Sequence, residues 1–179
     1  MRWAEMGKRQ PKLTERVRAS LLDPGVVLVG TITKDGTPRI SPVEPYLLDG
    51  DLWLSMMWQS HKAHDLERDP RILVHSIVRD REGSDGEVKV RGHAVPQHDP
   101  AVQQRYADSV AEAIGWHAEA GRFHLFAIDI QSVTSMQYEQ PSGDQYGTVW
   151  PPGREFVRRA TSATSVGAPE PVTRYLVPE

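Results

Sequence analysis

Short runs of apolar residues, separated by turn signals, fill the first three quarters of the chain. Runs of β-branched and other apolar residues predict strands, and the Gly, Pro and Asp clusters between them predict turns. We therefore expect six strands, over residues 26–33, 37–48, 52–58, 71–78, 87–95 and 123–136. The pairs Asp35-Gly36 and Asp49-Gly50 predict tight hairpin turns between the first three strands.

Apolar residues at helical spacing predict two longer helices beside these strands. The first covers residues 12–23, where Asp23-Pro24-Gly25 ends it. The second starts at Asp99-Pro100, because aspartate caps helices and proline fits their first position, and it ends near Gly115 or Gly121.

The predicted strand over residues 37–48 contains Pro38, Pro42 and Pro45. Proline cannot donate to a sheet, so one side of this strand must lack ladder bonds for part of its length, and that side is suited to face a ligand. Strands joined mostly by hairpins, with helices at the crossings, predict a mainly β antiparallel barrel with peripheral helices. Alternating βαβ units and a GxGxxG motif are missing, which argues against a dinucleotide-binding parallel sheet.

The composition changes after Tyr138, and six of the 14 prolines lie in residues 141–179. We expect a barrel domain over residues 1–140 and a Pro-rich C-terminal arm over residues 141–179 without a core of its own. The arm contains three large aromatic residues, which predict that it packs against another surface: Trp150, Phe156 and Tyr175.

Bulk properties narrow the classes of function. The chain has 179 residues, a net charge of -3 and no cysteine, and a pI of about 6.2. Nucleic-acid binding has no electrostatic support, because such domains usually carry a basic stripe. No run approaches the roughly 20 apolar residues of a membrane span, and no secretory signal is recognisable, so we expect a cytoplasmic protein. Without thiols, any redox role requires a bound cofactor.

The stretch around Ser60 is the strongest candidate for a binding site. Ser60 is placed to cap a short helix that stops at Asp69-Pro70, and Lys62 lies in its first turn. The first N–H groups of a helix lack partners and its dipole is positive there, so this junction can hold an anion. A solvated helix lysine is the alternative reading of Lys62. His61 and His64 are spaced to share a metal, but no third ligand and no HExxH motif accompany them, so we expect no metal site.

Residues 13–139 resemble the pyridoxamine 5'-phosphate oxidase-like flavoproteins, the FMN-binding split β-barrels. The resemblance rests on the hairpin of residues 31–43, the turn Asp49-Gly50, and the motif of residues 60–66 followed by Asp69-Pro70. It implies a six-stranded antiparallel split β-barrel that forms a homodimer, with FMN in a groove between the subunits. It also implies an oxidoreductase that acts on a small-molecule redox substrate.

The resemblance implies the following contacts for FMN. Arg39, Ser60 and Lys62 hold the phosphate, with His61 where many members have a second basic residue. Ser41 and Val43 share the strand face of Arg39 and so point toward the cofactor, and Ser55 and Met56 match the strand end along the ribityl chain and ring. No side chain is expected to act as a general acid or base, because the cofactor carries the hydride.

Two departures argue against vitamin B6 oxidation as the activity. Glu44 stands where the pyridoxamine phosphate oxidases have a lysine, and an acid there opposes a phosphorylated substrate. The arginine- and histidine-bearing C-terminal motif of those enzymes is also missing, with Thr173-Arg174-Tyr175-Leu176 at most a remnant.

Other readings remain open. The deazaflavin coenzyme F-420 could replace FMN, with Lys89 and Arg91 as further ligands of its acidic tail. The chain could instead store flavin, or bind haem through His75, His93 or His124, without turnover. The third alternative is a dimeric scaffold whose groove is empty.

Overall fold

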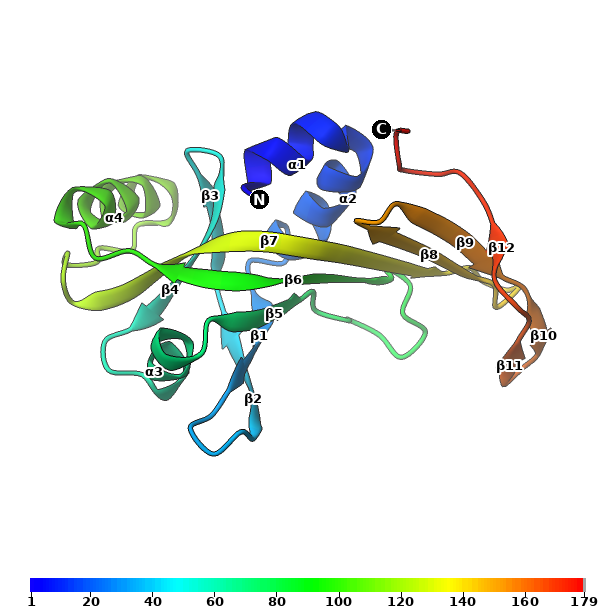
Figure 1. The fold of residues 1–179 in the computed structure, drawn as a ribbon, viewed down its shortest axis with the longest axis horizontal. Helices are drawn as coiled ribbons and strands as arrows, with labels where there is room; N and C mark the ends of the chain where they lie inside the picture. The colour runs from blue at the N-terminus through cyan, green and yellow to red at the C-terminus, as the bar shows by residue number, and fades with distance from the viewer. Residues whose placement is uncertain (179) are drawn as a thin grey trace.

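A ten-stranded antiparallel sheet holds the chain together, and its longest strand, β7 (Phe123–Tyr138), crosses most of the molecule (Figure 1). The structure is a computed structural model that describes residues 1–178. The other strands of this sheet are β1 (Val27–Ile32), β2 (Pro38–Val43), β3 (Pro45–Leu48), β4 (Asp51–Met57), β5 (Arg71–His75), β6 (Glu87–Pro96), β8 (Gln145–Trp150), β9 (Arg154–Arg158) and β12 (Glu170–Pro171). A separate hairpin consists of β10 (Ala160–Ser162) and β11 (Ser165–Val166).

The predicted mainly β antiparallel barrel with peripheral helices is confirmed. The predicted strand 37–48 breaks at Glu44 into β2 and β3. β2 pairs with β1, and β3 pairs with β4, so each half uses only one edge for pairing. The three prolines required such an arrangement. This split strand closes a ring in which β1, β5, β6, β7 and β4 follow one another by pairing.

Four helices lie around the barrel: α1 (Trp3–Arg9), α2 (Pro11–Leu22), α3 (His61–Arg68) and α4 (Pro100–Ile114). The cap of α4 is as predicted, because the Asp99 side chain accepts a hydrogen bond from Ala101 N at 2.8 Å. Gly115 ends α4 with a φ of 71°, the left-handed conformation that favours glycine. α1 was not predicted, since its seven residues present only Trp3 and Met6 to the core. No helix within residues 1–178 is long and apolar enough to cross a membrane.

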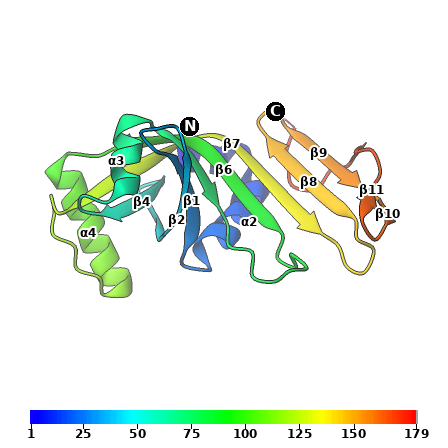
Figure 2. The ribbon, with the colours of Figure 1, turned by 90° about the horizontal axis from the view of Figure 1, so that it is seen from below.

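β7 joins the barrel to the C-terminal segment. Its first residues pair with β4 and its last residues pair with β8, while β6 lies along its other edge. Residues 141–178 therefore continue the sheet through β8, β9 and β12, beyond the barrel (Figure 2). Trp150 of β8 is 1% exposed and belongs to the main core. We propose that the boundary predicted at residue 140 separates the barrel from this extension of the sheet.

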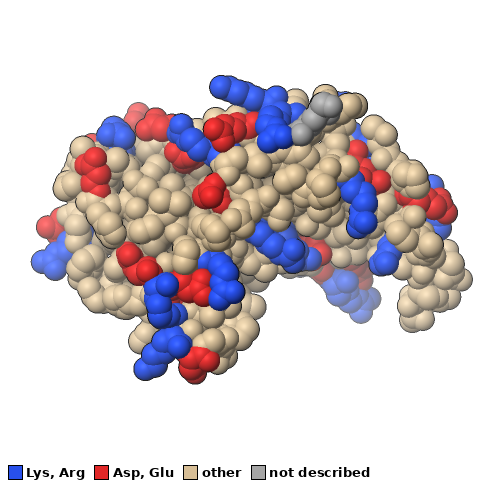
Figure 3. Space-filling model, viewed as in Figure 1, with Lys and Arg blue, Asp and Glu red and all other residues tan. Residues whose placement is uncertain are grey.

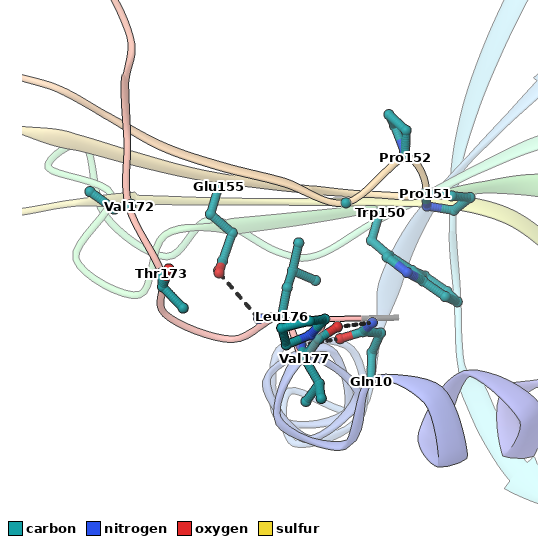
Figure 4. Close-up of a pocket in the computed structure, with 11 residues that line it drawn as sticks. Gln10, Trp150, Pro151, Pro152, Glu155, Val172, Thr173, Leu176 and Val177 are labelled. Carbon is teal, nitrogen blue, oxygen red and sulfur yellow. Dashed lines mark hydrogen bonds between the residues drawn. The ribbon is translucent and has the colours of Figure 1, made fainter.

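Two buried side chains fasten the C-terminal tail to the rest of the molecule. The carboxylate of Glu155 accepts hydrogen bonds from the backbone N–H groups of residues 174, 175 and 176, at 2.8, 2.8 and 3.2 Å. The Gln10 side chain donates to Val177 O at 2.9 Å and accepts from Val177 N at 2.7 Å. Figure 4 shows both side chains at the tail, beside a pocket of about 370 Å³. The tail is thus held from two elements that lie far apart in sequence.

Charged residues of both signs are interspersed on the face shown in Figure 3, and neither sign gathers in one broad patch there. This distribution agrees with the small net charge of -3. Any preference for an anion must therefore come from a local arrangement of groups.

We predict that Glu155→Gln lowers the free energy of unfolding by about 2 kcal/mol at pH 7, because the carboxylate loses charge-assisted hydrogen bonds. Burial of Glu155 disfavours its ionisation, but the hydrogen bonds from the backbone N–H groups outweigh burial and hold the pKa of Glu155 below its ordinary value. A lowered pKa stabilises the fold above the unfolded pKa, and this contribution disappears as the pH falls through the folded pKa. The gap between wild type and variant in urea unfolding should therefore close below about pH 4.

The matched control is Glu170→Gln, which removes the same charge from a side chain of β12 that is 62% exposed. It should change stability by under about 0.5 kcal/mol. A Glu155→Gln protein as stable as this control at pH 7 would show that the tail is not held by the carboxylate.

Candidate functional site

A buried carboxylate, that of Asp65, ties α3 to the first hairpin. Thr31 of β1 and Arg39 of β2 are partners in the strand register. Both donate to the same oxygen of Asp65, Thr31 Oγ1 at 2.9 Å and Arg39 Nε at 2.7 Å. Arg68 Nη2 lies 3.4 Å from the other oxygen. Because the Asp65 side chain is 5% exposed, moving α3 away from the hairpin would leave a buried charge without its partners.

The Asp65 carboxylate stays ionised at neutral pH. Burial disfavours its charge, but the hydrogen bonds from Arg39 and Thr31 outweigh burial, so the pKa of Asp65 lies below its ordinary value. Arg39 uses only Nε in this contact. Its two terminal nitrogens make no hydrogen bond within residues 1–178, and a third of its side chain is exposed. Arg39 can therefore bind a further anion.

Ser60 occupies the predicted N-cap position of α3, with a φ of -68° and a ψ of 144°. The prediction that its side chain caps the helix is wrong, because the hydroxyl makes no capping bond. Its Oγ atom is shielded from water and has no hydrogen-bond partner in the described part of the chain. A buried hydroxyl in this state costs about 1–3 kcal/mol. A ligand that offered a hydrogen bond to Ser60 would recover that cost.

Two further side chains lie in the first turn of α3. Lys62 is half-buried and His61 is exposed, and none of the ion pairs or hydrogen bonds found among residues 1–178 involves Lys62. Residues three apart on a helix are neighbours, with Cβ atoms about 5–6 Å apart, so Lys62 lies beside Asp65. Arg39 binds this carboxylate from β2, so it lies close to the same helix. Arg39, Lys62 and the free N–H groups of the first turn form a corner of groups that can hold an anion.

The side chains of β2 alternate as predicted. Arg39, Ser41 and Val43 share the more buried face, and Pro38, Ile40 and Pro42 are exposed on the other. Val43 is 5% exposed and packs in the main core, whereas Ser41 is half-buried. The shared face is therefore confirmed, while contact of these residues with a cofactor stays a prediction.

Ser55 and Met56 at the end of β4 lie on opposite faces of the strand. Ser55 Oγ accepts a hydrogen bond from the Tyr106 hydroxyl of α4 at 3.1 Å. Met56 is 2% exposed and packs in the main core. Burial raises the pKa of Tyr106. No hydrogen bond among the described residues joins Ser55 or Met56 to the corner at Arg39 and Lys62.

A groove of about 470 Å³ runs over strands β1, β2, β5 and β6. Arg39 lines it together with Arg71, Arg91 and His93, over an otherwise mostly apolar surface. Ile40, which is 71% exposed, lies at the same groove. Arg71 is paired with Asp69, but Arg91 takes no part in the ion pairs of residues 1–178. The groove suits a ligand or partner that is both apolar and anionic.

Sequence reasoning missed the role of Asp65 and Thr31. The available signal was a carboxylate on the apolar face of a two-turn helix, next to Leu66 and Ala63, which are both buried. A buried acid of this kind needs a partner, and Arg39 is that partner. Within residues 1–178 no three or more His, Asp or Glu side chains gather around one point suited to a metal ion.

The family model described as pyridoxamine 5'-phosphate oxidase matches residues 13–137. The chain belongs to this family. The match covers both strands of the first hairpin and α3, so the corner around Asp65 lies wholly inside the family region. No curated protein sequence matches the chain.

Solved structures of the same fold agree with this assignment. A putative pyridoxamine 5'-phosphate oxidase from Listeria innocua matches with a TM-score of 0.57 at 16% identity, over 69% of this chain and 97% of that one. A NimC/NimA family protein from Clostridium acetobutylicum matches with a TM-score of 0.58 at 12% identity, over 79% and 92%. A protein from the same organism, related to general stress protein 26 of the pyridoxinephosphate oxidase family, matches with a TM-score of 0.56 at 17% identity, over 80% and 94%. At these identities the likeness concerns the fold.

We predict that Asp65→Asn lowers the free energy of unfolding by about 1–3 kcal/mol, because it weakens the charge-assisted bond to Arg39 in a buried setting. Urea unfolding at pH 7 measures the change. Asp23→Asn is the control, since Asp23 pairs with Arg18 at 3.4 Å on the surface and is 55% exposed. That exposed pair should contribute under about 1 kcal/mol. Equal losses in the two variants would contradict the proposed anchoring role of Asp65.

Proposed function

We propose that the chain binds FMN by its phosphate at the corner of β2 and α3 and acts as an FMN-dependent oxidoreductase. The observation that carries this proposal is the Ser60 hydroxyl, which is buried without a partner at the start of a helix. A phosphate oxygen at that point would accept its hydrogen bond. Within residues 1–178 Lys62 has no ion-pair partner, and Arg39 uses only Nε in its contact with Asp65. The Lys62 ammonium and the terminal nitrogens of Arg39 would therefore balance the phosphate charge.

The energies are adequate for a micromolar complex. Each charge-assisted hydrogen bond to the phosphate contributes about 1.5–3 kcal/mol, and the helix terminus up to about 2 kcal/mol. A micromolar dissociation constant requires about 8 kcal/mol. Ser60, Lys62 and Arg39 approach this value when stacking of the ring is added, before ordering costs are subtracted.

The protein's part in the reaction is positioning and electrostatics. Bound flavin would supply the hydride chemistry. The Asp65 carboxylate orients Arg39 through Nε at 2.7 Å and so aims its terminal nitrogens outward. Because Asp65 is ionised, it also offsets one positive charge of the corner, which leaves Lys62 as its main uncompensated cation.

The groove over β1, β2, β5 and β6 supports a homodimer with the cofactor between subunits. Its apolar surface and the 71% exposed Ile40 are suited to be covered by a second copy of the chain. Arg91 would then face the cofactor or the partner. Glu44 is exposed where β2 meets β3, and its charge disfavours a phosphorylated substrate there, so we propose a substrate other than a vitamin B6 phosphate.

The visible spectrum of the purified protein is the first test. A yellow protein with flavin absorbance supports the proposal, and a Soret band would indicate haem. Titration of the protein without bound cofactor with FMN, coenzyme F-420 and haem then ranks the affinities for these cofactors. Reduction of the bound cofactor by NAD(P)H or by reduced F-420 tests turnover. Tighter binding of F-420 than of FMN would favour the deazaflavin alternative. Flavin binding without turnover from either donor would favour storage.

We predict that Lys62→Ala weakens FMN binding at least tenfold and leaves the thermal melt of the apo-protein almost unchanged. The ammonium has no partner within residues 1–178, so its loss affects only a bound anion. Fluorescence titration with FMN measures the affinity. Lys34→Ala in the exposed hairpin turn removes the same charge away from α3 and should bind FMN like the wild type. An unaltered affinity in Lys62→Ala would remove the phosphate assignment.

We predict that Ser60→Ala does not destabilise the apo-protein, although alanine at an N-cap usually costs about 0.5–2 kcal/mol. Here the hydroxyl makes no capping bond and is buried without a partner, so its removal takes away a penalty. The same variant should bind FMN more weakly. A lowered melting temperature with unchanged FMN affinity would show instead that Ser60 serves the helix.

A further inference from the structure

A second cleft, of about 320 Å³, lies where the last turn of α3, the start of α4 and the first residues of β7 meet. Both helices are at the end of the molecule where β7 begins (Figures 1 and 2). The cleft shares no lining residue with the corner at Ser60, Lys62 and Arg39. Its volume falls in the range of small-molecule pockets, which starts at about 300 Å³.

Trp58 forms one wall of this cleft. Its ring stacks on that of His124, with the centroids 4.9 Å apart and the planes at 19°, yet the residue is still 47% exposed. His124 Nε2 accepts a hydrogen bond from Gln59 N at 3.3 Å, and Nδ1 lies 3.4 Å from Glu67 Oε1. Since Nε2 is an acceptor, Nδ1 carries the proton and donates to Glu67. The imidazole is therefore held in place, and it supports the indole from one side.

Among residues 1–178, Glu67 is the only acidic residue that lines the cleft, and no lysine or arginine of this range lines it. Its ion-pair contacts within residues 1–178 are to histidines alone, His124 at 3.4 Å and His98 at 3.9 Å. It also lies in the last turn of α3, where the helix dipole disfavours an anion by about 0.3–1 kcal/mol. Nothing in its own helix explains an acid at this position.

The floor of the cleft is apolar. Phe123 and Leu125 are 3% and 2% exposed and line it from β7. Gln103 lines it too, and its amide already makes two hydrogen bonds, donating to Gln97 O at 2.8 Å and accepting from Gly121 N at 2.8 Å. Beside the exposed His98 imidazole and Gln97 at its rim, the cleft thus offers a ligand an apolar floor, the exposed part of an indole and one carboxylate.

An aromatic face and a carboxylate in one cleft are the groups that bind organic cations. We propose that this cleft binds a planar organic cation, an N-alkylated or protonated heteroaromatic amine, with its ring against Trp58 and its charge against Glu67. This site uses none of the side chains proposed to hold the FMN phosphate and does not depend on FMN.

The test uses three probes of one shape: N-methylquinolinium, neutral quinoline at pH 7.5, and quinoline-4-carboxylate. Calorimetric titration of the full chain should show the cation binding at least tenfold more tightly than quinoline, and no binding of the carboxylate. The indole N–H signal of Trp58 in the NMR spectrum, assigned by its loss in Trp58→Phe, should shift with the cation.

Two variants separate the roles of charge and ring. Glu67→Gln keeps an acceptor for His124 and should bring the affinity for N-methylquinolinium down to that for quinoline. Trp58→Leu should weaken both. Glu82→Gln, which removes the same charge from the exposed loop between β5 and β6, should bind all three probes like the wild type.

Equal affinity for cation and neutral probe, or a Glu67→Gln protein that still prefers the cation, would overturn the proposal. So would the absence of any shift at Trp58. Binding of N-methylquinolinium should be the same in Lys62→Ala and in the presence of saturating FMN. Failure of FMN binding would therefore leave this site standing, and failure of cation binding would leave the FMN site standing.

Discussion

The contact between Asp65 and Arg39 is the constraint on which the candidate site depends. α3 has eight residues, too few for a helix to persist alone in water. Buried Ala63 and Leu66 fix it on the barrel, and the Asp65 carboxylate fixes its rotation by binding Thr31 and Arg39 of the hairpin. Through this one carboxylate a strand residue and the start of a helix come together, although Arg39 and Ser60 lie 21 positions apart in the chain.

The barrel around this corner is shaped by its split strand. β2 and β3 are one stretch that breaks at Glu44, and each half pairs on one edge only. That leaves the outer side of β2 without a ladder partner and places exposed Ile40 beside a groove lined by three arginines. An edge with prolines resists uncontrolled pairing with other strands, so contact with a second chain there must use side chains rather than backbone.

The two ends of α3 have opposite chemical character. Its first turn carries Lys62, an unpartnered Ser60 hydroxyl and the positive end of the dipole. Its last turn carries Glu67, which faces Trp58 and His124 across a separate cleft. The two proposed sites would therefore use different residues of one short helix and the chain just before it. The C-terminal extension is remote from both, since Glu155 and Gln10 fasten its tail beside α1 and α2.

The sequence by itself determined the strands of the barrel, the turns at Asp35-Gly36 and Asp49-Gly50, the start of α3, the cap of α4, and the barrel class. These depend on local signals, namely periodicity, turn chemistry and capping residues, which act between residues close in the chain. The motif around Ser60 likewise predicted where α3 begins. The sequence did not predict α1, because seven residues with two core side chains give too weak a helical pattern.

Only the tertiary structure decided which side chains remain without partners. It placed Val43 and Met56 in the core, Ser55 against Tyr106 and Asp65 against Arg39. It also joined residues 141–178 to the sheet and brought Trp58, Glu67 and His124 around one cleft. Burial and hydrogen bonding between distant segments depend on how the strands pair in space, and no local pattern in the chain encodes them.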